Sequence, residues 1–594
     1  MSKTHLLFTF LFTLMTNSIL QAASHPQISF KVSFKEPQAH YAEVQMNLAD
    51  VKGKEVEVAM PVWAPGSYLV REFAKNVEGF GAYSAGGSSL NFEKTDKNTW
   101  KIKTAGNKNI VLKYRVYAFE VSVRTSFIDA NHAFLSPTGI FMYVKGALDA
   151  PVTVEVAPHH TWSKISTGLE AVAGQKNTFK AQNFDWLFDS PIEVGNQDIF
   201  EFEAAGVHHE FAMVGGGNYD KERLIKDVSK IIEEETAMFG VNPNKRYVFI
   251  VHNYLKGGGG LEHLNSTVLG ATRDNYTNPA KYNDFLSLVA HEYFHLWNVK
   301  RLRPIALGPF DYDKENYTRE LWIAEGFTAY YDNMLTLRIG AYSKSSYLKI
   351  LQADMALVKN SEGAKVQSVS DASFDAWIKQ YRPNENSINT SISYYNKGAV
   401  LAAMLDLAIL HETKGQKGLD NVMRQAYEEF YVKKQRGYTS EEFKSLLEKV
   451  SGRNLDQFYD DYVNGTKDLD LNAYLSFVGY ELRTKENTPE PFTGLTIDQN
   501  GLVTKVIRNS PAWTEGINVN DEILAVNGER VRDINEAVKK MNIGDEAVVL
   551  LNRDGLVKEV KMRVFADPRE EWELSKLKNA TEEQQAQFKR WLRQ

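Results

Sequence analysis

Alternating apolar and polar positions dominate the first third of the chain. Residues 28–34 alternate strictly, and residues 56–60 and 110–117 alternate in part. Such alternation places one face of a strand in a core and the other face towards solvent. The pattern predicts a β-sandwich-like domain over residues 24–204. The turn-rich apolar segment 61–68 is expected to be a packed loop, with a wall facing a neighbouring domain as the alternative.

The periodicity changes in the next part of the chain. Residues 221–239 carry apolar positions at helical spacing, and residues 246–252 read as a short apolar strand. Helical spacing returns in residues 284–290 and through much of residues 340–475. We therefore expect a mixed α/β domain with a helical C-terminal part over residues 205–480.

The motif His-Glu-Tyr-Phe-His occupies residues 291–295, at the end of an expected helix. On a helix, His291 and His295 lie one turn apart on the same face, so their imidazoles can reach one metal ion. Glu292 can then reach a water molecule activated by the metal without binding the metal itself. This is the arrangement of zinc-assisted hydrolysis. Taken alone, the five-residue motif also fits a helix with two ordinary histidines.

A carboxylate in an apolar helix supplies a candidate third ligand. Glu325 lies within the apolar run 320–331, where an unpaired carboxylate would be costly to bury. Two histidines from one helix and a glutamate from the next make a His₂Glu zinc site with an open position for water. Glu320 is the alternative ligand, and we prefer Glu325 because its apolar neighbours fit a core-facing helix.

Two further segments carry weaker signals. Gly259 and Gly260 belong to a run of four glycines before Glu262, and such a run lets backbone approach a ligand. Glu262 could then bind the free amine of a substrate, although a flexible loop explains the glycines equally well. Tyr394 and Tyr395 stand at the head of an apolar helix, where a hydroxyl could bond a developing oxyanion or a ring could simply pack.

Composition narrows the chemistry. None of the 594 residues is a cysteine, which excludes disulfides, thiolate zinc sites and cysteine nucleophiles. Any zinc must therefore be held by histidine and carboxylate. The net charge of −6 argues against a nucleic-acid-binding surface.

The N-terminus predicts export. A basic start precedes a short apolar run, and small residues follow at Ala22 and Ala23. This is typical of a signal peptide, which we assign to residues 1–23. A buried N-terminal helix or an uncleaved anchor is the alternative. We expect no membrane span after cleavage and an exported protein, periplasmic or secreted, from a bacterium.

Five segments together resemble a known family. The sequence is similar to the PDZ-containing glycyl aminopeptidases, which are gluzincin metallopeptidases related to thermolysin and to the larger zinc aminopeptidases. The segments that carry the resemblance, in chain order, are 61–68, 259–263, 291–304, 322–331 and 394–398. The resemblance implies a thermolysin-like catalytic domain over residues 205–480, one zinc ion, and removal of N-terminal Gly or Ala from peptides.

The same resemblance assigns roles to residues. It implies that His291, His295 and Glu325 are the zinc ligands. Glu292 would be the general base, and Glu262 would anchor the α-amine of the substrate, beside Gly259 and Gly260. Tyr395 would stabilise the tetrahedral intermediate, with Tyr394 as the fallback.

The chain departs from the related enzymes at two positions. An asparagine follows the amine-anchoring glutamate in the related aminopeptidases, and here His263 follows Glu262. Thermolysin carries an aspartate four residues after its glutamate ligand, and here that position is Ala329. The partners of the two histidines are therefore left unassigned.

The C-terminal region looks like a PDZ domain, which we place at residues 488–566. Its expected role is β-augmentation, in which a C-terminal peptide adds to a strand edge and its carboxylate meets backbone N–H groups near Gly494 and Leu495. A spacer domain with a blocked groove is the alternative. Residues 567–594 are expected to form a charged helical tail packed on the body.

The sequence thus predicts a multidomain α+β zinc metallopeptidase that acts on peptides. An aminopeptidase is the main hypothesis, and a PDZ-guided endopeptidase is the second. A PDZ-based peptide-binding protein with a vestigial metal site is the third.

Overall fold

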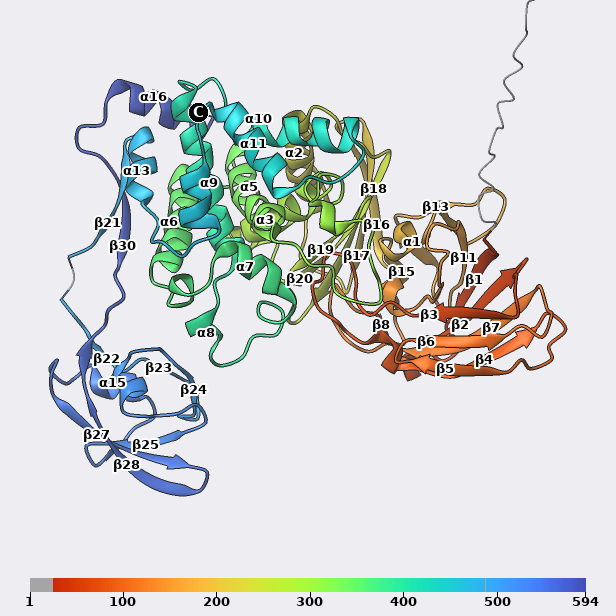
Figure 1. Cartoon of the computed structure of the whole chain (residues 1–594), viewed down its shortest axis with the longest axis horizontal. Coiled ribbons are helices and arrows are strands. Elements are labelled where there is room, and N and C mark those ends of the chain that lie inside the picture. The colour runs from red at the N-terminus through yellow and green to blue at the C-terminus, as the bar shows by residue number, and fades with distance from the viewer. Residues whose placement is uncertain (1–24, 487, 594) are drawn as a thin grey trace, which may run out of the picture.

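The computed structural model describes residues 25–486 and 488–593 (Figure 1). The expected signal peptide, residues 1–23, lies outside the described residues. A β-rich N-terminal region, a largely helical centre and a small C-terminal β domain follow one another in space as in sequence (Figure 1). This confirms the prediction of a multidomain α+β chain. In the described part of the chain, no helix has both the length and the apolar character needed to cross a membrane.

Two sheets share the apolar core of the N-terminal domain, which ends before β16 at residue 198. The strict alternation of residues 28–34 appears as a strand whose side chains alternate between buried and more exposed. The larger sheet has the order β13-β14-β11-β1-β2-β7-β4, with β1 (Gln27–Ser33), β2 (Tyr41–Ala49), β4 (Val77–Ser84), β7 (Ile110–Tyr117), β11 (Val152–Ala157), β13 (Glu170–Ala171) and β14 (Thr178–Ala181). The second has the order β10-β3-β6-β5, with β3 (Glu55–Ala59), β5 (Phe92–Asp96), β6 (Thr99–Lys103) and β10 (Tyr143–Val144).

A third small sheet connects this domain to the centre of the molecule. Its order is β12-β15-β9-β8, with β8 (Phe127–Ile128), β9 (Ala133–Leu135), β12 (Lys164–Thr167) and β15 (Ile192–Gly195). Glu193 on β15 is fully buried and bonds His132 at 2.7 Å and His252 at 2.9 Å. Because His252 belongs to the central domain, this buried cluster ties the two domains together.

The central domain is built on a five-stranded sheet of order β16-β17-β18-β20-β19, so it begins at residue 198 and not at residue 205 as expected from the sequence. The strands are β16 (Asp198–Ala204), β17 (Val207–Val214), β18 (Arg246–Tyr254), β19 (Gly260–Glu262) and β20 (Ser266–Thr272). Strand β19 lies at the sheet edge and pairs antiparallel with β20. Helix α2 (Lys221–Phe239) and helix α3 (Pro279–Phe294) pack together beside the sheet. Asn278 caps α3, and Pro279 fits its first turn, where the missing N–H has no helical partner.

The helical part of the central domain brings two distant segments together. Helix α5 (Gly326–Arg338) crosses α9 (Tyr394–Glu412) at Gly326 and Gly398, where a Cβ atom at Gly326 would come within 2.6 Å of the Gly398 Cα. Only glycines permit this close crossing. The other α-helices described in this part are α4 (Leu321–Ala324), α6 (Lys344–Lys359), α7 (Val369–Phe374), α8 (Ser387–Thr390), α10 (Leu419–Ala426), α11 (Ser440–Ser451), α12 (Asp456–Phe458) and α13 (Leu471–Leu475).

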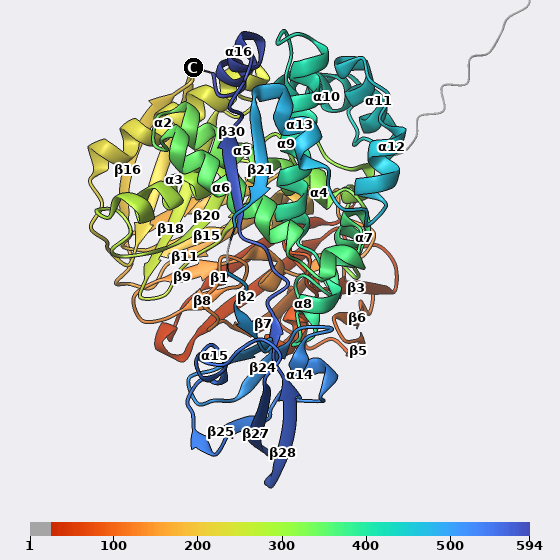
Figure 2. The same cartoon turned by 90° about the vertical axis from the view of Figure 1, so that its left-hand side faces the viewer.

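A two-stranded stalk carries the C-terminal domain (residues 488–566). Strand β21 (Tyr480–Thr484) pairs with β30 (Trp572–Lys576). The C-terminal domain follows the end of β21 and precedes the start of β30, so it lies at that end of the stalk (Figure 2). Its elements include β23 (Leu495–Ile497), β24 (Val503–Val506), β25 (Glu522–Val526), α15 (Ile534–Val538), β27 (Glu546–Arg553) and β28 (Leu556–Arg563).

The chain returns from the stalk to the central domain. The expected helical tail therefore begins as a strand, because Trp572 and Leu574 pack against the helical core while β30 pairs with β21. Helix α16 (Glu582–Trp591) follows, and its Trp591 donates a hydrogen bond to the Tyr330 hydroxyl at 2.9 Å.

Candidate active site

The two histidines and Glu325 converge on one point. His291 lies in the last turn of α3, His295 directly follows that helix, and Glu325 joins α4 to α5. The distance from Glu325 Oε2 to the Nε2 atom of His295 is 3.3 Å, and to that of His291 it is 3.6 Å. All three ligand atoms lie within 4.8 Å of one another.

This geometry fits a zinc ion. The Nδ1 atom of His291 bonds Asp332 at 2.9 Å and that of His295 bonds the Asn298 carbonyl at 2.7 Å, which leaves both Nε2 atoms facing Glu325. Tetrahedral zinc with bonds of about 2.0–2.1 Å places neighbouring ligands about 3.3 Å apart, close to the observed spacing. Three protein ligands also leave the fourth position for water or substrate.

The alternative ligand Glu320 lies elsewhere. Its carboxylate accepts a hydrogen bond from the Ser440 hydroxyl, and it is absent from the group of metal-binding candidates among the described residues. The geometry therefore favours Glu325 over Glu320, and the roles of the ligands stay predictions until metal binding is measured.

Asp332 is a site residue that sequence reasoning missed. It lies two turns after Glu325 on α5, and its carboxylate orients the His291 ring through the Nδ1 contact. Such a bond fixes the imidazole tautomer and raises its basicity as a ligand. The sequence signal was an acidic residue seven positions after Glu325, on the same helix face.

Glu292 is buried beside the three candidate metal ligands His291, His295 and Glu325, which we call the metal-binding cluster. Its side chain is buried, and its Oε2 atom has no hydrogen-bond partner among the described residues. Burial raises the pKa of the Glu292 carboxyl to about 7, against the opposing effect of the two histidines. A Cβ atom at Gly260 would lie 2.2 Å from Glu292 Oε1, so only glycine leaves room for this carboxylate.

Glu262 faces the same point from the sheet edge. Gly260 and Glu262 share one face of β19, while Leu261 points into an apolar cluster on the other. Carboxylate oxygens of Glu262 and Glu292 lie within 4.8 Å of a His295 nitrogen and of each other. Glu262 is 4 % exposed, and its Oε1 atom has no partner in the described part of the chain.

The segment 61–68 forms a wall of this site, so the packed-loop interpretation was incomplete. A Cβ atom at Gly66 would come within 2.5 Å of Glu262 Oε1. The carboxylates of Glu325 and Glu262 interact electrostatically with the buried Tyr68 hydroxyl. Burial is the main cause that raises the pKa of Tyr68, and the two carboxylates raise it further. The wall therefore comes from the N-terminal domain.

Tyr395 lies beside a candidate metal ligand. Its ring stacks near that of His291, with 6.3 Å between ring centres, and its hydroxyl lies 3.5 Å from the Tyr381 hydroxyl. Tyr394 is fully buried, and its hydroxyl has no partner among the described residues. The structure therefore places Tyr395 beside His291 and adds Tyr381, which the sequence did not indicate.

His263 is tied into the fold. Its Nδ1 atom bonds the buried Asp189 at 3.0 Å, and Lys300 bonds the same carboxylate at 2.7 Å. This departure from the related aminopeptidases therefore connects β19 to the N-terminal domain instead of adding a group to the metal site.

At the expected peptide-binding edge of the C-terminal domain, the backbone of Leu495 already forms hydrogen bonds within the domain. The Leu495 N–H donates to the Thr493 hydroxyl at 3.1 Å, and the Leu495 carbonyl accepts a 3.4 Å hydrogen bond from Asn535. Gly494, with φ of +81°, packs against Ser510. A peptide carboxylate would have to displace the Thr493 contact to reach this N–H group.

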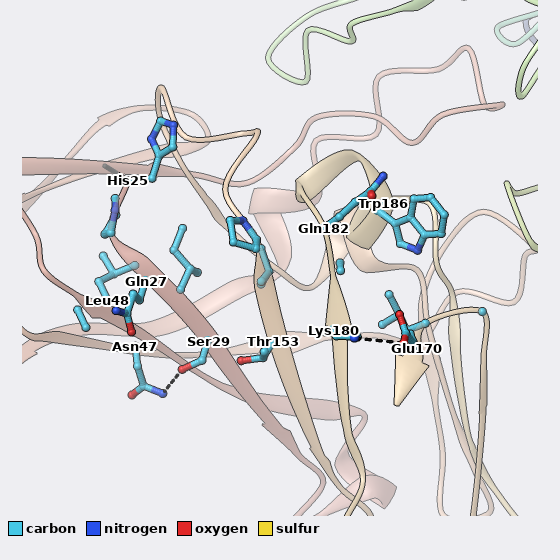
Figure 3. A pocket seen from close by; sticks show the side chains of 18 of the residues that line it. His25, Gln27, Ser29, Asn47, Leu48, Thr153, Glu170, Lys180, Gln182 and Trp186 are labelled. Carbon is cyan, nitrogen blue, oxygen red and sulfur yellow. Dashed lines mark hydrogen bonds and ion pairs between the residues drawn. The ribbon is translucent and has the colours of Figure 1, made fainter. Parts of the chain in front are cut away.

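A cavity of about 1160 Å³ lies elsewhere, where β1, β2 and β11 face the start of β18 (Figure 3). Polar pairs such as Lys180 with Glu170 and Asn47 with Ser29 lie along its lining (Figure 3). It shares no residue with the metal-binding cluster, so cavity size does not mark the candidate active site.

Comparisons with known proteins agree with this geometry. Models of three known protein domains match the chain: the peptidase M61 N-terminal domain at residues 29–196, M61 glycyl aminopeptidase at residues 284–401, and a PDZ domain at residues 502–553. The second match contains the His-Glu-Tyr-Phe-His motif and both candidate tyrosines. No curated protein matches the sequence.

Solved structures add a likeness over nearly the whole chain. A crystal structure of an aminopeptidase N family protein from Idiomarina loihiensis is 29 % identical, with a TM-score of 0.88, and the match covers 95 % of this chain and all of that one. Two structures of an M1 zinc metallopeptidase from Deinococcus radiodurans, one of a variant bound to a Tyr-Ser-Ala substrate, are 14 % and 12 % identical. Their TM-scores are 0.49 and 0.47, and each match covers 75 % of this chain and 95 % of the other.

The three domain matches, in the order expected from the sequence, and the His₂Glu cluster inside the peptidase match identify the protein class. The chain belongs to the M61 glycyl aminopeptidase family of metallopeptidases and carries a PDZ domain.

Proposed function

We propose that this protein is an exported zinc aminopeptidase that removes small residues, Gly or Ala, from the N-termini of peptides. One observation carries the proposal: the buried Glu262 carboxylate forms no ion pair with a lysine or arginine among the described residues, its Oε1 atom lacks a hydrogen-bond partner there, and it lies beside Glu292 and His295. An unpaired buried carboxylate is costly. The ammonium group of a substrate N-terminus has the charge and the size to complete it.

The metal-binding cluster would hold the zinc. His291, His295 and Glu325 supply the ligands, and zinc bound there polarises the scissile carbonyl and activates water. The orientation of the first histidine by Asp332 and of the second by the Asn298 carbonyl supports this assignment.

The other residues of the site bind the substrate or transfer protons. Glu262 holds the α-amine, which brings the first peptide bond over Glu292. Glu292 takes a proton from the attacking water and returns it to the leaving amine, a role that suits a carboxyl with a pKa near neutrality. Tyr395 donates a hydrogen bond to the carbonyl oxygen as negative charge develops there.

Two features support a preference for small N-terminal residues. The edge strand β19 offers its backbone to an extended peptide, and Gly259 and Gly260 let that peptide lie close. The amine end of the site lies at Glu262, and it is closed there by Gly66 and Tyr68. A large first side chain would meet this wall.

Export rests on the sequence of the N-terminal segment. Its basic start, short apolar run and small residues near Ala23 support a cleaved signal peptide. We therefore place the enzyme in the bacterial periplasm or outside the cell.

Replacement of the amine anchor tests the proposal. Glu262→Gln removes the charge and keeps the size, so KM for Gly-p-nitroanilide should rise about tenfold or more, as expected for loss of a charge-assisted hydrogen bond. The matched control is Glu320→Gln, another buried glutamate of the domain that bonds Ser440 instead. An unchanged KM in Glu262→Gln would contradict the role of Glu262.

A further inference from the structure

Arg124 reaches the metal-binding region from the N-terminal domain. It lies in the loop between β7 and β8, and its Nη2 atom donates a hydrogen bond to the Gly260 carbonyl at 3.2 Å. Its Nε atom is buried without a hydrogen-bond partner, and no carboxylate pairs with the guanidinium among the described residues. The guanidinium is therefore half-buried next to the site, with no carboxylate of the described residues paired to it.

The loop that carries Arg124 is fixed against β19. Val123 packs with Leu261 in one apolar cluster, so the two segments share a core. Within the loop, the Arg124 N–H bonds the Ser122 hydroxyl at 3.1 Å, and the Thr125 hydroxyl bonds the Glu120 carbonyl at 3.0 Å. A long side chain held at its base in this way is placed for binding, not free in solvent.

The guanidinium lies within the electrostatic field of the site. Burial lowers the pKa of Arg124, but four neighbours outweigh it and raise the pKa above the ordinary value. These neighbours are Tyr381, Tyr395, Glu292 and Glu262. A second arginine, Arg71, is close enough to interact electrostatically with Arg124. The exposed carboxylate of Glu120 lies 3.8 Å from the Arg71 guanidinium. The N-terminal domain thus lines this side of the site with cations.

The order of residues along β19 sets the direction of the substrate. If the α-amine lies at Glu262, a peptide that follows the strand edge runs past Gly260 towards Gly259. Arg124 stands on that side, since its Nη1 atom would lie 3.8 Å from a Cβ atom at Gly259. Strands advance about 3.3 Å per residue, so this path matches a peptide of about two or three residues.

We infer that Arg124 binds the free C-terminal carboxylate of very short peptides, so that the enzyme acts on di- and tripeptides with both ends charged. This inference rests on the proposed function and names its substrate class. Glu262 and Arg124 then hold opposite ends of the substrate, and the distance between them selects its length. A guanidinium can offer a carboxylate two parallel N–H donors, which gives this contact its strength.

The test compares a tripeptide with its own amide. Release of free glycine from Gly-Gly-Phe and from Gly-Gly-Phe amide gives a ratio of kcat/KM values for substrates that differ only in the terminal carboxylate. We expect a ratio of about ten or more in the wild-type protein, since charged hydrogen bonds contribute at that level. In Arg124→Gln the ratio should fall towards one.

Arg115→Gln is the matched control, because Arg115 lies on β7 of the same domain and pairs with Glu78 at 2.8 Å. It should keep the wild-type ratio. If Arg124→Gln does not fold, Arg124→Lys takes its place, with an expected fall of about threefold because an ammonium lacks the planar fork.

The outcomes separate this inference from the proposed function. A wild-type ratio near one, or a ratio that Arg124→Gln leaves unchanged, overturns the carboxylate contact while glycine release itself still supports the aminopeptidase. Absence of glycine release from both peptides would overturn the aminopeptidase function and the inference with it.

Discussion

Gly66 of the N-terminal domain lies directly against the carboxylate of Glu262 in the central domain. The backbone φ of Gly66 is +81°, and a Cβ atom there would come within 2.5 Å of Glu262 Oε1. The candidate amine site is therefore built by two domains. The N-terminal domain supplies the wall, and the central domain supplies the carboxylate and the metal ligands.

A methyl group at position 66 should disturb the amine site. Gly66→Ala has to displace the Glu262 carboxylate, so we expect kcat/KM for Gly-p-nitroanilide to fall about tenfold or more, the scale set by one charged hydrogen bond. The control is Gly146→Ala, since Gly146 has the same φ of +81° and nothing within 4 Å of the added atom. It carries the same backbone strain without the contact. Equal losses of activity in both variants would show that the contact with Glu262 does not matter.

Loss of Asp332 should weaken metal binding before it affects anything else. Asp332→Ala frees the His291 ring, and removal of such a partner costs about 10- to 100-fold in metal affinity. Activity should return when excess zinc is added. Metal titration against a chelator measures the change, and Glu320→Gln should titrate like the wild-type protein. An unchanged metal affinity in Asp332→Ala would remove Asp332 from the site.

Glu292→Gln should separate catalysis from metal binding. The amide keeps the shape but cannot accept the proton, so we expect kcat to fall about 10²- to 10⁴-fold. Bound zinc should remain at one ion per chain, because Glu292 is not among the three ligands. Metal analysis beside steady-state kinetics makes the comparison. Full activity in this variant would exclude Glu292 as the general base.

The buried cluster between the two domains should make stability depend on pH. Burial alone would raise the pKa of Glu193, yet His132 and His252 lower it below the ordinary value. For His132, burial lowers the pKa, and Glu193 more than compensates and raises it. The stabilisation from Glu193 is present above its unfolded pKa and is lost as pH falls through the folded one. The stabilisation from His132 is present below its unfolded pKa and is lost as pH rises through the folded one.

Both contributions are therefore complete between about pH 4.5 and about pH 6.5, the ordinary values of the two groups. Glu193→Gln should lower the melting temperature most near pH 5.5, and its effect should shrink as pH rises and His132 loses its proton. Thermal unfolding at several pH values measures this difference. Glu203→Gln is the control, since Glu203 pairs with His208 at 2.9 Å on the surface, where such pairs contribute little. The same loss at every pH would rule out an ionised cluster.

Local pattern was enough to predict the metal-binding cluster. The spacing of His291 and His295 follows from one helical turn, and Glu325 was marked by its apolar neighbours. The strict alternation of residues 28–34 and the helical spacing of residues 221–239 likewise correspond to β1 and α2. These signals depend on residues close together in the sequence.

The surroundings of the cluster depend on contacts between distant segments. Arg124 is 136 residues from Gly260, and the rest of the N-terminal domain and the first strands of the central domain separate Gly66 from Glu262. Neither residue stands in a periodic pattern that points to the other. Asp332 is the exception, because its spacing from Glu325 on one helix could have indicated it. The tail at residues 572–576 was expected to be helical and is a strand, since pairing with β21 overrides local preference.

Hydrolysis of Gly-p-nitroanilide beside its N-acetylated form, with and without a chelator, tests the central claim most directly. Acetylation removes the positive charge that Glu262 is proposed to bind and leaves the rest of the substrate unchanged. We predict rapid release from the free amine, at least about 100-fold slower release from the acetylated form, and loss of both with the chelator. Equal cleavage of the two substrates, or cleavage that survives metal removal, would contradict a zinc aminopeptidase.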